Sequence, residues 1–376
     1  METIKGLKAM VLAAGVGSRL DPLTRSTPKP LVPLANRPVM EHILALLKRH
    51  NINDIVSNVH HLPEQVPAYF GDGSNLDMNL TYKHEQILSG DAGGVRSCRK
   101  FLQDGTFLVI MGDLITDADI SYVVEQHKSK GAIATIALQK VADVRHFGVA
   151  VTDADSFIKG FQEKPSPEEA ISDLASTGIY VLEPEVFDHM PADGQYGFGR
   201  QLFPSLVEKG LPVLGVQVFG YWSDIGTMEN YKLSSFDALK GLIDIELPGQ
   251  KTQHGWYDSG ASVASDCNID ARVLIGKNSR LDPGVTLKGH VIIGDNCHIK
   301  SGAVIEDSII WAGTTVGANA ILIDSVLGNN VEVADRCVMT GEVTTEPVKL
   351  KPVEKTADLA SANVLLSQLQ QPVGAR

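Results

Sequence analysis

The sequence predicts an α/β domain with a mostly parallel sheet, followed by a second domain of short stacked β-strands. Residues 7 to 245 alternate short apolar runs with helical patterns, which is typical of parallel strands joined by helical crossovers. After about residue 262 the helical patterns stop, and apolar residues recur every six positions. At 376 residues the chain is longer than one hydrophobic core usually grows, so two domains are expected.

The first elements can be assigned in chain order. MVLAAG, residues 10 to 15, is a continuous apolar run that predicts a buried strand. Pro38 favours a helix start, and VMEHILALLKRH after it places four apolar side chains on one face. These four are Met40, Ile43, Leu44 and Leu47. DIVSNV predicts the next strand, and FLVIMGD, residues 107 to 113, predicts another that ends at an acidic residue.

A repeat of six residues organises the second domain. Its larger apolar residues are Ile269, Ile275, Leu281, Leu287, Ile293, Ile299, Ile305 and Trp311. A smaller residue precedes each by two positions: Cys267, Val273, Ser279, Val285, Val291, Cys297, Ala303 and Ile309. After a one-residue slip the series continues through Val316, Leu322, Leu327, Val333 and Met339. Each hexapeptide is too short to bury its own apolar side, so the coils must stack; the pattern resembles left-handed β-helices, with about four coils.

These patterns divide the chain into four parts. Residues 1–245 form the first domain, 246–262 a linker, 263–341 the repeat domain, and 342–376 a tail. The tail includes DLASANVLLSQL, in which Leu359, Ala362, Leu366 and Leu369 share one stripe. This stripe predicts a short helix that docks or lies at an interface, or else a frayed end.

The bulk composition excludes several partners. A formal net charge of −12 and an isoelectric point near 5.4 provide no basic surface for nucleic acid or an anionic membrane. Four cysteines without an apolar signal segment indicate reduced thiols, so a cytoplasmic location is expected. Any polyanion must therefore be bound by a local arrangement of charges.

The segment after the first strand has the composition of a phosphate loop. Gly15-Val16-Gly17-Ser18-Arg19-Leu20 lacks the third glycine of the dinucleotide fingerprint, and no Gly-Lys-Ser/Thr follows it. Gly-x-Gly alone predicts no more than a tight turn. Arg19 and Lys29 add two cations suited to a triphosphate, and Pro28 and Pro30 restrict the backbone around Lys29. The loop is thus a candidate for binding phosphates through its N–H groups.

Several ordered motifs resemble those of the sugar-nucleotide pyrophosphorylases, the NDP-sugar nucleotidyltransferases, over about residues 7 to 340. The motifs are Gly15 to Thr24 with Pro28-Lys29-Pro30, Gly112-Asp113, Phe147-Gly148-Val149, Glu163-Lys164-Pro165, Thr177-Gly178-Ile179-Tyr180 and Gly220 to Thr227. The resemblance implies a Rossmann-like catalytic domain with an appended left-handed parallel β-helix. Among the branches of the family, the chain most resembles the mannose-1-phosphate guanylyltransferases.

The resemblance also implies a reaction, in which a sugar 1-phosphate attacks the α-phosphorus of a nucleoside triphosphate and pyrophosphate leaves. Arg19 and Lys29 would be the catalytic cations, and Asp113 and Asp224 would share Mg²⁺. The implied nucleotide-binding residues are Leu12, Ala13, Ala14, Gly15, Gly17, Ser18, Glu85, Gly90, Ala92 and Gly93. The implied sugar-phosphate residues are Gly148, Glu163, Lys164, Thr177 and Gly178.

The base is suggested by Glu85, five residues before Gly90, where many uridylyl- and thymidylyltransferases of the family have glutamine. A carboxylate only accepts hydrogen bonds, and guanine presents two neighbouring donors. We therefore expect GTP with mannose 1-phosphate, with UTP or dTTP and glucose 1-phosphate as the alternative. Two departures from the family, Asp91 in Gly90-Asp91-Ala92-Gly93 and Ser176 before Thr177, bear on this choice.

Two other functions compete with this one. A regulatory relative without activity is disfavoured because both cations and both metal acids are present. An acyl transfer on the β-helix would need a basic residue, for which His290 and His298 are the candidates. Cys267, Cys297 and Cys337 occupy the small slot of the repeat, which indicates core packing rather than metal binding. The repeats thus favour a stacking module, and we expect a homo-oligomer.

Overall fold

The computed structural model describes residues 6–349 and divides into two compact units between Glu246 and Leu247. The expected helix with the stripe from Leu359 to Leu369 lies outside the described residues. No helix within residues 6–349 is long and apolar enough to cross a membrane.

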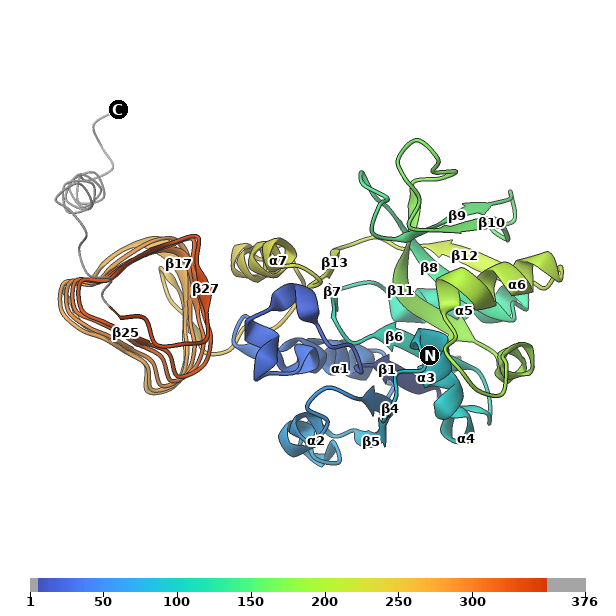
Figure 1. Ribbon diagram of the computed structural model, residues 1–376, viewed down its shortest axis with the longest axis horizontal. Coiled ribbons are helices and arrows are strands. Elements are labelled where there is room, and N and C mark those ends of the chain that lie inside the picture. The colour runs from blue at the N-terminus through green and yellow to red at the C-terminus, as the bar shows by residue number, and fades with distance from the viewer. Residues whose placement is uncertain (1–5, 350–376) are drawn as a thin grey trace. The chain divides into compact units, whose positions relative to one another are not determined.

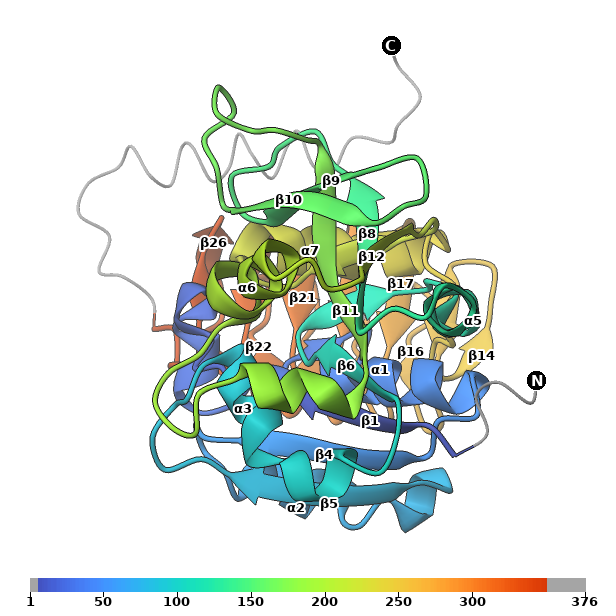
Figure 2. The ribbon, with the colours of Figure 1, turned by 90° about the vertical axis from the view of Figure 1, so that its right-hand side faces the viewer.

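A nine-stranded sheet forms the centre of the first unit, with the order β10-β9-β11-β6-β1-β4-β5 and with β8 and β12 extending from β11. The strands are β1 (Lys8–Leu12), β4 (Asp54–Val59), β5 (Asn79–His84), β6 (Phe107–Met111), β8 (Ala134–Lys140), β9 (Gly148–Thr152), β10 (Ile158–Glu163), β11 (Leu174–Leu182) and β12 (Val213–Gln217). Strands β5, β4, β1 and β6 are parallel, as expected. Figure 2 shows β5, β4 and β1 side by side, whereas β11 joins β6 in the antiparallel sense.

Helices cover both faces of this sheet, with α1 on one side and α3 on the other (Figures 1 and 2). They are α1 (Val39–Arg49), α2 (Gln65–Phe70), α3 (Asp91–Ser97), α4 (Arg99–Leu102), α5 (Ile120–Lys130), α6 (Phe203–Glu208) and α7 (Met228–Lys240). Shorter turns are η2 (Ser18–Leu20), η3 (Leu23–Arg25), η4 (Lys29–Leu31), η5 (Ser74–Leu76), η6 (Pro184–His189) and the π-helical η7 (Phe198–Leu202). Helix α1 buries Met40, Ile43, Leu44 and Leu47, the four residues of its expected apolar face.

Two small sheets lie apart from the main one. Strand β13 (Trp222–Asp224) pairs with β7 (Leu114–Thr116), and β2 (Pro33–Leu34) pairs with β3 (Arg37–Pro38). All four strands have two or three residues, too few for a periodic pattern to be recognised.

Stacked coils form the second unit, whose three-sided outline is visible in Figure 1. One sheet contains β14 (Gln250–Lys251), β15 (Gly255–Tyr257), β17 (Asn268–Ile275), β19 (Thr286–Ile293), β21 (Val304–Ile310), β23 (Ile321–Ile323), β24 (Val326–Leu327), β26 (Val338–Thr340) and β27 (Val343–Thr344). A second contains β16 (Ser262–Val263), β18 (Arg280–Leu281), β20 (His298–Ile299), β22 (Thr315–Val316) and β25 (Glu332–Val333). Ile269 pairs with Leu287 and Leu287 with Ile305, three hexapeptides apart each time, whereas Ile305 pairs with Leu322 after the slip.

The expected linker at 246–262 contains strands of the first coil. Gly255 and Tyr257 of β15 pair with Val273 and Ile275 of β17, so Gly255 takes the small slot and Tyr257 the large one. A Cβ atom at Gly255 would overlap the Val273 carbonyl oxygen, so only glycine fits. Because glycine occupies the small slot here, the six-residue apolar pattern cannot be recognised in the sequence of this coil.

Buried hydroxyl groups join successive coils. Thr314 is fully buried, donates to the Gly328 carbonyl oxygen at 2.9 Å and accepts from the Val331 N–H at 3.1 Å. Ser279 likewise donates to the Gly294 carbonyl oxygen and accepts from the Cys297 N–H. These contacts satisfy backbone groups that the coil corners leave without ladder partners.

Thr314→Val removes this hydroxyl with little change of shape. We expect the β-helix to lose about 1–3 kcal/mol of unfolding free energy, because a buried N–H and a carbonyl lose their partner. Urea denaturation followed by circular dichroism measures the loss. Thr315→Val, at the neighbouring partly exposed position, is the matched control. Equal stability of the two variants would contradict the expectation.

Candidate active site

The candidate site lies at the edge where β1, β4 and β6 end. Leu12, the last residue of β1, pairs with Asn58 on one side and with Met111 on the other. The carboxyl ends of parallel strands form the usual ligand edge of such sheets. A cavity at this edge is lined by Leu12, Ala13, Ala14, Gly15, Lys29, Pro30, Asn58, Glu85, Leu88, Gly90, Asp91, Met111, Gly112 and Asp113. Eight of the expected site residues thus meet in one hollow.

A second cavity adjoins the first. Its expected members are Asp113, Gly148, Glu163, Lys164, Thr177, Gly178 and Asp224. Asp91, Met111 and Asp113 line both cavities. The residues expected for the nucleotide and those expected for the sugar phosphate therefore gather in neighbouring spaces with a shared wall.

Five expected residues line neither cavity: Gly17, Ser18, Arg19, Ala92 and Gly93. The Gly93 N–H donates to the Tyr196 carbonyl oxygen at 2.9 Å, and the Ala92 N–H is 2.7 Å from the Asp91 carboxylate. These two N–H groups of α3 are therefore already engaged in hydrogen bonds within the protein.

The phosphate loop is a tight turn held from both ends. The Ala13 N–H donates to Oδ1 of Asn58 at 2.8 Å, and the Gly17 carbonyl accepts from the Thr24 hydroxyl at 3.0 Å. Gly17 has φ +72°, and a Cβ atom there would lie 3.0 Å from the Thr24 methyl and 3.1 Å from Lys29 Cβ. Within residues 6–349, the N–H groups of Ala14 and Gly15 have no recorded acceptor, which leaves them available to a ligand.

Lys29 and Asp113 form an ion pair on the wall of the first cavity. Lys29 is only 7% exposed, and its ammonium group donates to Oδ2 of Asp113. Asp113 reaches this position because Gly112 lets β6 approach β1 closely: a Cβ atom at Gly112 would lie 2.6 Å from the Leu12 carbonyl oxygen. A cation this buried is costly without a charged partner, so Asp113 stabilises the buried position of Lys29.

Asp224 is brought beside Asp113 by the small sheet that the sequence did not predict. Asp224 of β13 pairs with Leu114 of β7, and the Ile225 N–H donates to the Asp113 carbonyl at 3.0 Å. The Asp224 carboxylate accepts a hydrogen bond from the Asn230 amide at 2.9 Å. Two acids far apart in sequence thus become neighbours.

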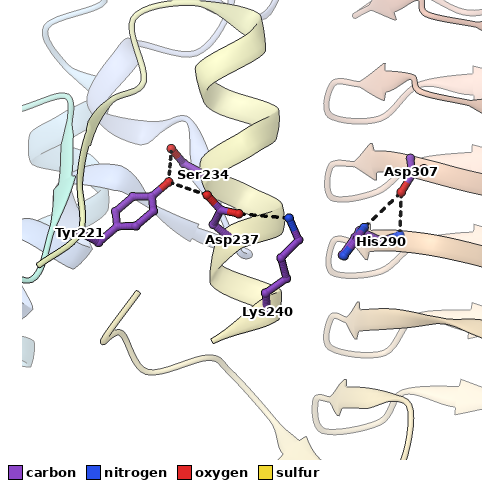
Figure 3. Close-up of polar contacts among 6 residues, drawn as sticks. All are labelled: Tyr221, Ser234, Asp237, Lys240, His290 and Asp307. Carbon is purple, nitrogen blue, oxygen red and sulfur yellow. Dashed lines mark hydrogen bonds and ion pairs between the residues drawn. The ribbon is translucent and has the colours of Figure 1, made fainter. Parts of the chain in front are cut away.

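The segment before β13 is anchored to α7, as Figure 3 shows. The Tyr221 hydroxyl donates to the Asp237 carboxylate at 3.1 Å and lies 3.2 Å from the Ser234 hydroxyl, and Lys240 pairs with Asp237. The Tyr221 N–H donates to Asp117 at 2.7 Å. These contacts fix the path of the chain into Asp224.

Arg19 lies on the exposed side of the loop, near the segment after Asp224. A Cβ atom added at Gly226 would lie 2.7 Å from Oδ2 of Asp224 and 3.0 Å from Nη2 of Arg19. Glycine at this position therefore leaves room for both charged groups.

Glu163 occupies the second cavity between two glycines. It ends β10 opposite Gly148 of β9, and a Cβ atom at either Gly148 or Gly199 would clash with its Oε2. Burial raises the pKa of the Glu163 carboxyl, and the nearby Asp91 adds to this, while Lys164 opposes it. The acid is thus held in a confined space beside a cation.

Thr177 lines the second cavity, but its polar atoms are committed elsewhere. Its hydroxyl donates to the Ala137 carbonyl at 2.9 Å, and its own carbonyl accepts from the Trp222 indole N–H at 2.8 Å. Trp222 packs against Phe147 with ring centroids 4.9 Å apart. The wall of this cavity is therefore rigid and partly aromatic.

Glu85 differs most from its expected environment. Its side chain is buried, Oε1 accepts from the Asn58 amide at 2.5 Å, and Oε2 accepts from the N–H and hydroxyl of Ser89 at 3.0 and 2.6 Å. A carboxylate free to pair with both donors of guanine would need both oxygens open toward the cavity. Asn58 and Ser89 were not among the expected residues, although a polar residue near the end of a buried strand, as at Asn58, is a recognisable signal.

Asp91 stands on the wall between the cavities. Its Oδ1 accepts from the Phe198 N–H at 2.8 Å as well as from Ala92. Burial raises the pKa of the Asp91 carboxyl above its ordinary value, although these N–H groups and Lys164 oppose the effect.

Asp91→Asn tests this environment through the pH dependence of stability. A carboxyl with a raised folded-state pKa loses stability as pH rises through that value, because the ionised form is penalised by burial. The neutral variant escapes this loss. We expect its thermal midpoint to exceed that of the wild type increasingly from acidic to neutral pH. A difference independent of pH would contradict the expectation.

Comparison with known proteins identifies relatives of both units. The nucleotidyl transferase family model matches residues 8–240, and a model of the EIF2B subunit epsilon LbH domain matches residues 252–353. A UTP–glucose-1-phosphate uridylyltransferase of Synechocystis sp. is 39% identical, covering 85% of this chain and 87% of that protein. A mannose-1-phosphate guanylyltransferase of Mycobacterium tuberculosis is 33% identical, covering 79% of this chain and 82% of that protein.

A solved structure shares the fold of the first unit. It is a Bacillus anthracis protein described as a putative glucose-1-phosphate thymidylyltransferase, and it is 29% identical with a TM-score of 0.58. The match covers 64% of this chain and 97% of that one. Because the family model spans more than half of the chain and both relatives align over most of it, the chain belongs to the nucleotidyl transferase family and is a sugar-1-phosphate nucleotidyltransferase with an appended hexapeptide β-helix.

Proposed function

We propose that the nucleoside triphosphate binds in the cavity at the ends of β1, β4 and β6, and the sugar 1-phosphate in the adjoining one. The observation that carries this proposal is the shared wall of Asp91, Met111 and Asp113. Alignment supplies much of the rate of such transfers, so the two substrates need neighbouring sites. A phosphate oxygen of the sugar 1-phosphate forms the new bond to the α-phosphorus, and pyrophosphate leaves with the electrons of the broken P–O bond.

Two cations are proposed to reduce the electrostatic repulsion between these two polyanionic substrates. Lys29, buried beside Asp113, offsets charge near the α-phosphate, while the fork of Arg19 on the exposed side suits the leaving pyrophosphate. The N–H groups of Ala14 and Gly15, together with Gly17 and Ser18, cradle the remaining phosphate oxygens. Leu12, Ala13 and Gly90 line the same cavity and are proposed to contact the base and ribose.

Asp113 and Asp224 are proposed to hold Mg²⁺, which when bound neutralises phosphate charge. Their carboxylate oxygens are the donors this ion prefers. Within residues 6–349, no group of three or more His, Cys, Asp or Glu side chains could hold a metal. Two carboxylates completed by phosphate oxygens and water are nevertheless a common Mg²⁺ arrangement.

The sugar phosphate is proposed to bind Lys164 through its charge and Glu163 through its hydroxyl groups. Backbone groups at Gly148 and Gly178 complete this cavity. Thr177 supports the wall rather than the substrate, because its hydroxyl is used by Ala137.

Two substrate pairs are supported by different observations. GTP with mannose 1-phosphate follows from the carboxylate at Glu85 and from the guanylyltransferase relative. UTP with glucose 1-phosphate follows from the uridylyltransferase relative and from the hydrogen bonds of Glu85. Oε2 already accepts two hydrogen bonds from Ser89, so a double contact with guanine would have to displace one of them. We favour the second pair.

Pyrophosphate release with Mg²⁺ decides between them. GTP, UTP, dTTP and ATP are each combined with mannose and glucose 1-phosphates, and initial rates are compared. A UTP–glucose maximum supports the favoured pair, and a GTP–mannose maximum restores Glu85 as a reader of guanine. Absence of release with every pair would contradict the proposed site and indicate a regulatory relative.

The β-helix is proposed to serve stacking and self-association rather than acyl transfer. His290 contacts Asp307 through both its backbone N–H, at 2.9 Å, and its ring (Figure 3), and His298 pairs with Asp282 at 2.8 Å. Both rings are thus engaged by neighbouring coils. Burial raises the pKa of Cys297 to about 11, so its thiol remains protonated and packs as a core residue.

Asp113→Asn tests the metal assignment. The amide keeps an oxygen acceptor for Lys29 but removes its charged partner, so we expect the variant to fold with lower stability, while Mg²⁺-dependent turnover falls by about 100-fold or more. Initial rates over a Mg²⁺ series measure the effect. Asp104→Asn, which removes the same charge from an exposed ion pair with Lys8, is the matched control. Wild-type rates in Asp113→Asn would exclude the assigned role.

A further inference from the structure

A chain of buried hydrogen bonds joins the phosphate loop to the loop after β5. It begins at the Ala13 N–H, which donates to Oδ1 of Asn58 at 2.8 Å, and continues from the Asn58 amide to Oε1 of Glu85 at 2.5 Å. Oε2 of Glu85 then accepts from the N–H and hydroxyl of Ser89. Because the Ala13 N–H needs an acceptor, the orientation of the Asn58 amide is determined. We call these residues, Ala13, Asn58, Glu85 and Ser89, the loop relay.

The surroundings of the relay leave little freedom for other arrangements. Asn58 is 2% exposed and Glu85 6% exposed. A Cβ atom at Gly94 of α3 would lie 2.7 Å from the Asn58 amide nitrogen and 3.0 Å from Oε1 of Glu85. The backbone of Glu85 is also held, since its carbonyl lies 2.7 Å from the His60 ring nitrogen. Gly94 thus leaves just enough space for the two side chains, and His60 holds the backbone of Glu85.

Both ends of the relay belong to the first cavity. Ala13 lines this cavity at the start of the turn, and Ser89 precedes Gly90, which lines the same space. Binding a flexible triphosphate costs less free energy when the groups that contact it are already in place. A rigid link between the loops would hold them at the spacing that one nucleotide requires.

We propose that Asn58 and Glu85 are positioning residues, which couple the phosphate loop to the loop around Gly90 and so set the affinity for the triphosphate without either side chain reading the base. This inference rests on the proposed nucleotide site. In this role the negatively charged carboxylate of Glu85 serves to accept hydrogen bonds from Asn58 and Ser89.

An exchange of the amide and the carboxylate provides the test. Asn58→Asp alone places a carboxylate against Oε1 of Glu85, and Glu85→Gln alone creates a contact between two N–H donors at either Asn58 or Ser89. The double variant combines both substitutions. Its new carboxylate at position 58 accepts from the Ala13 N–H and from the new amide at position 85, and the oxygen of that amide accepts from Ser89. The double variant therefore restores every hydrogen bond of the relay, and both side chains keep their shapes.

We expect each single variant to raise the KM for the preferred triphosphate by about 10- to 100-fold, since a buried polar group loses its partner. The KM for the sugar 1-phosphate and the kcat should change by less than about threefold. The double variant should return the triphosphate KM to near the wild-type value with the same base preference. Ser57→Ala is the matched control, because its buried hydroxyl donates to the Val11 carbonyl and contacts Asn58 only at its backbone carbonyl, so no side-chain hydrogen bond of the relay is removed.

Amide hydrogen exchange of the nucleotide-free protein provides a second readout. Ala13 and Ser89 should lose protection in the single variants and regain it in the double variant, whether or not the protein turns over the tested substrates. Absence of turnover in the wild type therefore contradicts the proposed function, whereas unchanged protection of Ala13 and Ser89 in the single variants contradicts the relay.

Three kinetic outcomes would overturn the inference. Unchanged triphosphate KM in both single variants would show that the relay does not set affinity. If the KM values for both substrates rise equally and in proportion to the loss of thermal stability, as in Ser57→Ala, the role of the relay is merely structural. A double variant that regains protection but prefers another base would show that Glu85 reads the base directly.

Discussion

The parallel pairing of β1 between β4 and β6 is the constraint on which the site depends. It places Leu12 between Asn58 and Met111, so the residues that follow β1 and β6 and the polar end of β4 converge at one edge. Gly112 permits the close approach of β6, because any side chain there would meet the Leu12 carbonyl. The positions of Lys29, Asp113 and the phosphate loop follow from this backbone geometry, and the side chains add the charges.

The site must bind anionic substrates although the protein as a whole is acidic. The formal net charge is −12, and Asp91, Asp113 and Glu163 stand on the cavity walls. Only an ion placed within a few ångströms can offset two phosphate-bearing substrates against such a field. Lys29 and Lys164 stand on the same walls and supply positive charge at close range, and the Mg²⁺ proposed at Asp113 and Asp224 would add to it, so the site can bind anions without a basic surface. A net negative charge is therefore compatible with anionic substrates, because the positive charges that contact them are local.

Sequence patterns predicted the features that recur within a short window. The period of six identified the stacked coils, and the apolar runs at β1, β4 and β6 identified the parallel sheet, because each pattern is repeated locally. The pairing of β7 with β13 was not predictable, since three-residue strands carry no period and the partners are far apart in sequence. Gly255 shows the same limit, because its slot in the coil is defined only by its contact with Val273.

Glu85 shows why the role of a side chain cannot be assigned from its position in the sequence alone. Its position before Gly90 was recognisable, and it does line the cavity. Its role depends on Asn58, which lies in another strand, and on Gly94, which leaves space for both side chains. A carboxylate that is fully solvated can exchange partners at low cost, whereas a buried one with three protein donors loses free energy whenever a ligand displaces a donor. Burial thus converts a group chemically suited to recognise a base into one better suited to hold two loops together, and this distinction is visible only once the hydrogen-bond donors around it are known.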